Sequence, residues 1–316
     1  MKKAAAIVLS FILLLCAGCS SDSSLKLGAA EVGGMYAEFA NVLAQVAEKE
    51  DVNVQLNVKS TAGSLANVRL LSEGYLQLGI SQEDLVNAAY YGEDDYKDNQ
   101  MTGYSAVADL FLEACQIIVR ADSEIQSVDD LFGKKVSIGG EESGTERNAN
   151  QILQIYGLTK NQVTCKNYGY TDGAKALISG EIDAMFVTSG TKTNVVEEIA
   201  RQCDIRLISL DEEHIEKLQK SFSFYNSCTI PAGTYSGQEE DVNTVGVHAI
   251  LLANNSLSSE TVEKLTAALF EYADEFQYSL PINLELEEED ATKDVTIPFH
   301  KGAAAYYETK GITVEQ

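Results

Sequence analysis

The segment ACQIIVRADSEIQSVDDLFGKKVSIGGEESGTERNANQILQIYG, residues 114–157, decides the fold. Residues 115–120 have the alternating pattern and the β-branched side chains that are typical of a strand. Residues 135–138 predict a second strand, which ends at paired glycines. Between them, residues 127–133 predict a short helix that a glycine stops. A longer helix comes next, so the segment predicts a strand, a glycine-rich turn and a helix in succession.

Ser143, Gly144 and Thr145 stand where that longer helix begins. At a helix N-terminus the backbone N–H groups have no partner inside the helix and the dipole is positive, so an anion or a carboxylate can bind there. We therefore predict a ligand-binding loop at these residues. The alternative is that Ser143 or Thr145 only caps the helix, as such residues commonly do.

The order of strand, polar turn and helix recurs on both sides of this segment. Residues 25–29, 52–60 and 76–81 each predict a strand that runs into such a turn, and residues 163–170 and 182–188 repeat the pattern. Strands that alternate with helices predict a mainly parallel sheet, with the loops at the carboxyl ends of the strands along one edge. The polar turns of each half should therefore converge on one side.

The length favours two lobes, because about 290 mature residues can fill two cores of ordinary domain size. We assign residues 26–115 and 248–316 to lobe 1 and residues 116–247 to lobe 2. The predicted strands near residues 115–119 and 245–251 would then cross between the lobes. Two strands side by side form a hinge.

Residues 1–18 predict a lipoprotein signal peptide. Two lysines precede an apolar run that is too short to span a membrane comfortably, and small residues precede Cys19. The sequence CAGC at residues 16–19 resembles the lipobox of bacterial lipoproteins, although leucine is usual at its first position. We therefore expect a lipidated Cys19, with residues 19–25 as a tether between the membrane and an extracytoplasmic body.

The chain is strongly acidic. Its formal net charge is −25, which becomes about −27 when the signal peptide is removed with its two lysines. A surface of this sign argues against nucleic acid and anionic lipid as partners. It favours a soluble body that contacts the membrane only through its lipid anchor.

The cysteines and histidines of the mature body are scattered along the sequence. Zinc ligation would require close pairs of such residues, so we expect neither a metal site nor a cofactor. One disulfide is possible in an exported protein, but four buried thiols are the favoured interpretation. The residues concerned are Cys115, Cys165, Cys203, Cys228, His214, His248 and His300.

Seven glycine-rich or polar motifs follow one another in a fixed order. They are GGMY (33–36), STAGSLANVRLLSEG (60–74), LGISQ (78–82), SGTERNA (143–149), GEIDAMFVTSGT (180–191), IPAGTYSGQEEDVNTVGV (230–247) and FHKGAAAYYETKG (299–311). In this order they resemble the TAXI family of extracytoplasmic solute receptors, the binding components of one class of TRAP transporters. The resemblance covers nearly all of the mature chain.

This resemblance implies a type II periplasmic-binding-protein fold, in which two α/β lobes joined by two crossover strands close on a ligand. It also implies a small carboxylate or amino acid, glutamate-like or 2-oxoacid-like, that is delivered to a fused membrane permease subunit. Tyr36 could instead pack in the core, and Gln82 could instead cap a helix. The ligand contacts implied by the motifs are Gly34, Tyr36, Ser60, Gly63, Ser64 and Gln82 in lobe 1, and Ser143, Gly144, Thr145, Thr188 and Ser189 in lobe 2.

Glu31, Glu141 and Glu142 depart from the family pattern, in which small or uncharged residues are usual at these positions. A carboxylate beside a carboxylate ligand repels it by about 1 kcal/mol when well solvated. Either the ligand also carries an ammonium group, or these side chains point into solvent. The second interpretation is slightly favoured, because a run of charges is usually a solvated face.

An enzyme is the first alternative to a binding protein. It would need a nucleophile with a base, a pair of catalytic carboxylates or a metal cluster, and the sequence shows no such pattern. His248, on a predicted crossover strand near the hinge, is interpreted as a structural histidine. We therefore expect no enzymatic activity.

A ligand-sensing or adhesin-like surface lipoprotein that is not coupled to transport is the second alternative. Such a protein would use its outer faces, for which the acidic segments at residues 93–100 and 284–294 are candidates. Solvated loops that keep the protein soluble are the favoured interpretation of these segments.

Overall fold

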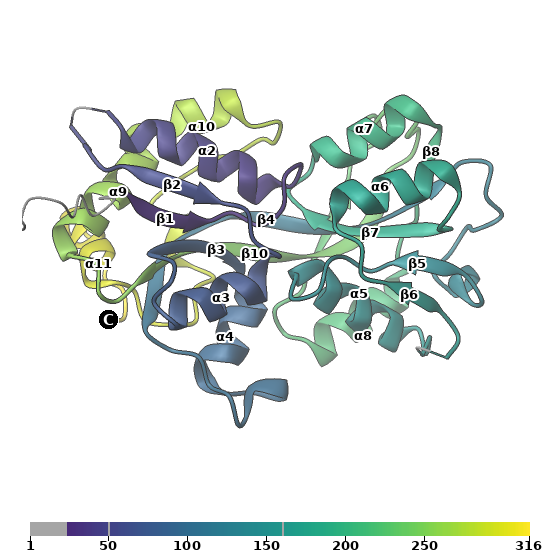
Figure 1. Ribbon diagram of the computed structural model, residues 1–316, viewed down its shortest axis with the longest axis horizontal. Helices are drawn as coiled ribbons and strands as arrows, with labels where there is room; N and C mark the ends of the chain where they lie inside the picture. Colours follow the sequence, from purple (N-terminus) through teal and green to yellow (C-terminus); the bar gives the residue numbers. More distant parts are fainter. Residues whose placement is uncertain (1–23, 50, 160) are drawn as a thin grey trace, which may run out of the picture.

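The computed structural model describes residues 24–49, 51–159 and 161–316. The predicted signal peptide and Cys19 lie outside the described residues. Figure 1 shows two α/β lobes side by side, with two long strands that run from one lobe into the other. The C-terminus lies in lobe 1.

Lobe 1 contains three parallel strands with helices on both faces. β1 lies between β2 and β3 and pairs with both, while α2 covers one face of the sheet and α3 and α4 cover the other (Figure 1). Leu27 and Ile80 are fully buried, as a sheet covered on both faces requires. The elements are β1 Leu25–Gly28, α2 Met35–Ala47, β2 Leu56–Lys59, α3 Ser64–Ser72, β3 Leu78–Gln82, α4 Glu83–Tyr91 and the 3-10 helix η1 Asp94–Tyr96.

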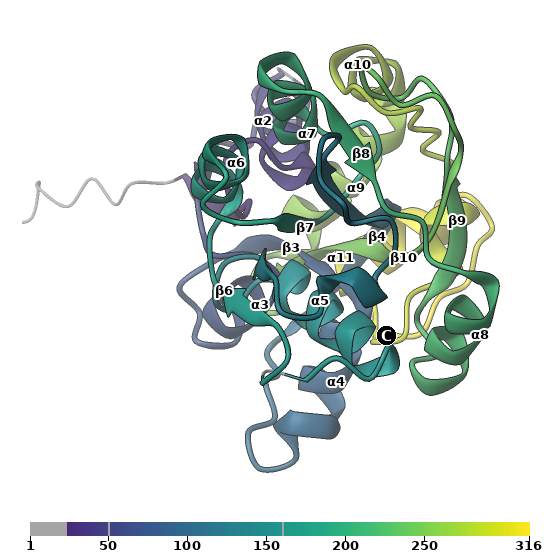
Figure 2. The same ribbon diagram turned by 90° about the vertical axis from the view of Figure 1, so that its right-hand side faces the viewer.

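Lobe 2 repeats this arrangement. β5 lies between β6 and β7 and is parallel to both. Figure 2, which is viewed from the lobe 2 side, shows α6 and α7 on one face of the sheet and α5 and α8 on the other. The elements are η2 Asp129–Leu131, β5 Lys135–Ser137, α5 Gly144–Ile155, β6 Thr164–Lys166, α6 Tyr170–Ser179, β7 Ala184–Ser189, α7 Asn194–Gln202, β8 Ile205–Leu207, α8 Glu212–Ser221 and β9 Asn226–Ile230.

The crossover strands are β4 Tyr104–Arg120 and β10 Val242–Asn254. They are antiparallel neighbours at the centre of one sheet with the order β2-β1-β3-β10-β4-β7-β5-β6. β8 pairs with the end of β4, and β9 pairs with β10. The strand predicted at residues 115–120 is thus only the last part of β4. The strand begins earlier, and its residues 104–114 pair with β10.

The C-terminal part of the chain returns to lobe 1. Two consecutive helices, α9 Ser259–Glu271 and α10 Ala273–Ser279, are separated at Tyr272. After the 3-10 helix η3 Asp290–Thr292, α11 Lys301–Thr309 packs against α9. Nδ1 of His300 accepts a hydrogen bond from the Gly302 amide at 3.1 Å and so caps α11.

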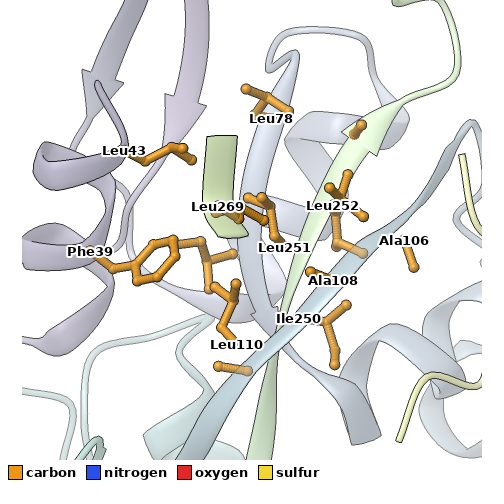
Figure 3. Packing of buried hydrophobic residues seen from close by; sticks show 14 of the residues in the cluster. Phe39, Leu43, Leu78, Ala106, Ala108, Leu110, Ile250, Leu251, Leu252 and Leu269 are labelled. Atoms are coloured by element: carbon orange, nitrogen blue, oxygen red, sulfur yellow. The ribbon is translucent and has the colours of Figure 1, made fainter. Parts of the chain in front are cut away.

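Each lobe has its own hydrophobic core. Phe39, Leu43, Leu251 and Leu269 pack together in lobe 1 (Figure 3). In lobe 2 the side chains of β4 alternate between two clusters, because successive residues of a strand point to opposite faces of the sheet. Within the described residues, no helix is long and apolar enough to cross a membrane.

All four cysteines of the body are reduced in the structure. Cys115 is buried, as expected, but the expectation of buried thiols is wrong for Cys165, Cys203 and Cys228, which are partly exposed. Cys165 and Cys228 lie on the outer strands β6 and β9, and Cys203 ends α7. Residues at such positions are covered on fewer sides than those of a central strand.

Candidate functional site

A small cavity lies between the two lobes. The space in it that is open to the centre of a water molecule is about 40 Å³, enough for about three or four waters at roughly 10–15 Å³ each. A ligand enclosed there must therefore be small. The cavity is lined by Ala30, Glu31, Gly34, Met35, Tyr36, Ala62, Gly63, Ser64, Gln82 and Glu113 on one side and by Gly140, Ser143, Gly144, Thr145, Tyr170, Thr188 and Ser189 on the other.

The structure brings together every predicted ligand contact except Ser60 at this cavity. Ser60 is exposed directly after β2, and its Oγ donates to the carbonyl oxygen of Ala30 at 3.1 Å. Its hydroxyl therefore holds the loop after β1, which carries the lining residues Ala30 and Glu31.

Four helices begin at the cavity: α2 and α3 in lobe 1, and α5 and α6 in lobe 2. Three of them have glycine at the N-cap, so their first amides have no capping side chain of their own. The positive ends of the helix dipoles point into a space that both lobes share, which is a setting for a carboxylate. The three glycines are Gly34, Gly63 and Gly169.

Side chains of lobe 2 satisfy some of these amides. The Met35 amide at the start of α2 donates to Ser189 Oγ at 3.1 Å. On α5, Ser143 Oγ accepts from the Glu146 amide at 3.0 Å. Ser143 is thus an N-cap, as the alternative interpretation of this residue required, and it also lines the cavity.

Glu31 reaches from lobe 1 to the start of α6 in lobe 2. Its Oε2 accepts from the Tyr170 amide at 2.6 Å. Burial raises the pKa of Glu31, although this hydrogen bond lowers it. A Cβ atom at Gly169 would lie 2.3 Å from the same Oε2, so the contact requires glycine at that position.

Glu142 also connects the lobes. Its carboxylate accepts two hydrogen bonds from the Arg69 guanidinium of α3, at 3.1 and 2.8 Å, and its carbonyl oxygen accepts from two amides in the first turn of that helix. Glu141 is exposed. The interpretation as solvated side chains therefore fits Glu141, whereas Glu31 and Glu142 contact the opposite lobe.

Glu113 is an acidic lining residue that the sequence did not single out. It lies on β4, is 3% exposed, and its Oε2 accepts from the Tyr36 hydroxyl at 2.6 Å. Burial raises the pKa of Glu113 to about 8, while hydrogen bonds from Tyr36 and Gln82 lower it. At pH 7 its carboxyl is mainly protonated unless a cation lies beside it. The only signal in the sequence is an acidic residue within an apolar run.

Hydroxyl groups form a chain along the lobe 2 wall. The Tyr170 hydroxyl donates to the Thr188 carbonyl at 2.8 Å and lies 2.9 Å from Thr145 Oγ1, which accepts from the Thr188 amide at 3.2 Å. Burial raises the pKa of Tyr170 well above its ordinary value, so the phenol stays neutral. These groups offer hydrogen bonds without a permanent charge.

Among the described residues, no lysine or arginine lines the cavity, and two carboxyl groups do. Backbone amides and hydroxyls can hold one ligand carboxylate. Glu113 can hold a cationic group next to it. A second ligand carboxylate would have no positively charged side chain to neutralise it.

A buried ion pair closes the cleft outside the cavity. Arg147 Nε of α5 lies 2.7 Å from Asp84 Oδ2 of α4, and the two side chains are 16% and 7% exposed. Arg147 Nη2 also lies 3.2 Å from Asp94 Oδ2. Because these pairs join different lobes, the structure is a closed conformation.

Comparisons with known proteins agree with this architecture. A protein-family model described as the NMT1-like family matches residues 27–311. MatC from Rhodopseudomonas palustris with bound malate has a TM-score of 0.57 and 13% identity, covering 82% of this chain and 88% of MatC. The periplasmic binding protein BugD has a TM-score of 0.54 and 13% identity, covering 81% of this chain and 86% of BugD.

An ancestral arginine-binding protein bound to arginine has a TM-score of 0.50 and 15% identity, covering 82% of this chain and 98% of that protein. At such identities the likeness shows the fold alone. The fold is that of type II periplasmic-binding proteins, which confirms the expected fold class.

Proposed function

Because the chain belongs to the NMT1-like family, we propose that it is an extracytoplasmic solute receptor of the TAXI type. It captures a small amino acid between its lobes and delivers it to the membrane permease of a TRAP transporter. The likeness to MatC with malate and to an arginine-binding protein supports a small solute as the ligand. The ordered series of TAXI-like motifs supports the transporter class.

Buried Glu113 is the observation that carries the choice of ligand. A 2-oxoacid and the corresponding amino acid share a carboxylate, which the helix N-termini and hydroxyls would bind equally in both. Only the amino acid has an ammonium group, and that group forms a charge-assisted pair with ionised Glu113, which a 2-oxoacid cannot form. The absence of a lining cation among the described residues further favours an amino acid with an uncharged side chain.

The mechanism is closure on the ligand. The solute contacts groups of both lobes at once, so its binding free energy is larger in the closed form than in the open form. Differential affinity of this kind shifts the population towards the closed form. The permease then distinguishes the closed receptor from the open one by shape.

The test compares matched ligand pairs by calorimetry: alanine with pyruvate, and glutamate with 2-oxoglutarate. We expect each amino acid to bind at least tenfold more tightly than its 2-oxoacid, since a charge-assisted hydrogen bond contributes about 1.5–3 kcal/mol. Glu113→Gln should remove most of this preference. Equal or tighter binding of the 2-oxoacids by the parent protein would exclude an amino-acid receptor.

Glu141→Gln is the matched control, because Glu141 is exposed and does not line the cavity. Its affinities should equal those of the parent. Coupling to transport is tested separately, by uptake of the labelled ligand in cells with and without this protein. Uptake that is unaffected by its loss would favour a sensor lipoprotein instead.

A further inference from the structure

A second polar cluster lies on the crossover strands, away from the solute cavity. It contains Asp109 of β4, His248 of β10 and Asp294, which follows η3. These residues line a separate hollow of about 280 Å³, measured as the space open to the centre of a water molecule, and none of them lines the solute cavity.

A β-bulge brings Asp109 and His248 together. The register between β10 and β4 shifts after Ala249, so that Ile250 pairs with Asp109 while His248 pairs with Leu112. His248 and Ile250 point to the same face of β10, and Asp109 therefore shares the face of His248. Nδ1 of His248 lies 2.6 Å from Asp109 Oδ2.

Asp294 approaches the same imidazole from the C-terminal acidic segment. Its Oδ2 lies 3.7 Å from His248 Nε2. One ligand atom from each of the three residues lies within 4.8 Å of the other two. A single ion binds one nitrogen of His248, so ligation by both carboxylates at the usual metal–ligand distances of roughly 2.0–2.2 Å requires the imidazole and Asp294 to reorient.

One buried carboxylate oxygen in the cluster, and another beside it, have no hydrogen-bond partner. Asp109 is 7% exposed and its Oδ1 accepts no hydrogen bond. Glu83, the first residue of α4 and an electrostatic neighbour of Asp109 and His248, is 5% exposed, and its Oε1 has no partner either. A buried carboxylate oxygen without a partner is costly, and a cation would relieve that cost.

Side chains of the protein supply little positive charge here. Lys293 is the one lysine or arginine among the described residues that line the hollow, and it pairs with Asp290. Glu285 and Glu287 add further negative charge to the lining. Even a protonated His248 leaves an excess of carboxylates.

We infer that Asp109, His248 and Asp294 form a binding site for a divalent transition-metal ion. One imidazole with two carboxylates suits Zn²⁺ or a related ion, whereas Ca²⁺ and Mg²⁺ prefer oxygen ligands alone. The bound ion would attach residues 284–294 to the two crossover strands. The scattered histidines of the sequence predict no metal site, because the ligands meet only through the pairing of β4 with β10 and the return of the C-terminal segment to these strands.

The test uses the purified protein after dialysis against a chelator and then metal-free buffer, with ZnCl₂ as the probe and no solute. We expect one Zn²⁺ per chain by metal analysis, and a rise in Tm on adding Zn²⁺, because an ion that binds only the native state stabilises it. His248→Gln and Asp294→Asn should each lower Zn²⁺ affinity by roughly tenfold or more. Asp294 is half exposed, so its variant tests the site without disturbing the core.

His214→Gln is the matched control. His214 forms an exposed pair with Asp211 at 2.8 Å, on α8 in lobe 2, and does not belong to the cluster. Its variant should bind Zn²⁺ like the parent. The inference fails if Zn²⁺ neither binds nor raises the Tm, if His248→Gln and Asp294→Asn bind it normally, or if CaCl₂ stabilises the protein and ZnCl₂ does not.

Discussion

Burial of Glu113 disfavours the ionised carboxylate, whereas the proposed binding of an ammonium group requires it. An ionised carboxylate in this cavity is poorly solvated, and its pKa is raised to about 8. The same carboxylate, once it pairs with an ammonium group, is stabilised in its charged form. Binding of an amino acid near neutral pH should therefore release a proton from Glu113.

The affinity for an amino acid should depend on pH as a result. Below pH 8, Glu113 must lose its proton before it can pair with the ligand, so affinity should rise about tenfold per pH unit and level off above pH 8. Calorimetry from pH 6 to 8.5, in buffers of different ionisation enthalpy, measures the affinity and the released proton together.

Glu113→Gln should abolish this pH dependence, because the amide does not titrate in this range. An affinity that is constant or falls as pH rises would mean that Glu113 binds the ligand as a neutral hydrogen-bond donor. That result would concern the charge state of Glu113 alone, because the matched ligand pairs test the preference for an amino acid independently.

Glycines at the starts of helices determine how closely the lobes approach. A Cβ at Gly169 meets Glu31 across the cleft, whereas a Cβ at Gly173, one turn further along α6, meets Met185 Cε at 3.0 Å within lobe 2. Gly169 has φ −66°, which alanine adopts freely. A methyl group added at Gly169 therefore disturbs a contact between the lobes, whereas one added at Gly173 disturbs a contact within lobe 2.

Gly169→Ala should displace the Glu31 carboxylate and remove its hydrogen bond to the Tyr170 amide. We expect ligand affinity to fall by about 1–2 kcal/mol, with little change in the Tm of the ligand-free protein. Gly173→Ala should leave affinity at the parental value, whatever its effect on stability. Calorimetry and thermal unfolding of both variants decide this, and equal affinities would show that the Glu31 contact does not support closure.

Sequence patterns located the strand–turn–helix units because those signals are local. The turns at residues 33–36, 60–64 and 143–145 all reach the cavity for this reason. The first part of β4 was missed, since Asp109 and Glu113 interrupt its apolar character at positions that the fold buries. Glu113 belongs to the proposed solute site and Asp109 to the proposed metal site. Their roles depend on contacts between distant segments, so they could not be read from the sequence.

The closed form of the whole molecule is held by ion pairs of unequal burial. The Arg147–Asp84 pair is largely buried, while the side chains of Arg69 and Glu142 are 37% and 40% exposed. When the lobes separate, the side chains of both ion pairs become exposed to water. Exposed pairs contribute at most about 1 kcal/mol, and hydrogen bonds to buried charged groups contribute about 1.5–3 kcal/mol.

Asp84→Asn should therefore weaken ligand binding by roughly 10- to 100-fold by shifting the population towards the open form. Glu142→Gln should weaken it less than about fivefold. Small-angle scattering of both variants with and without ligand measures the open fraction directly. If the two substitutions had equal effects on affinity and scattering, burial of the pair would not govern closure.

The position of the cavity between the lobes also has a kinetic consequence. A solute that contacts both lobes must lose its contacts with one of them before it leaves, so its residence time includes the time the lobes take to separate. Any substitution that slows separation lengthens that residence time, even when it makes no contact with the solute. Unloading is thus limited by the motion of the protein, and a docking partner that holds the lobes apart would accelerate it without touching the solute.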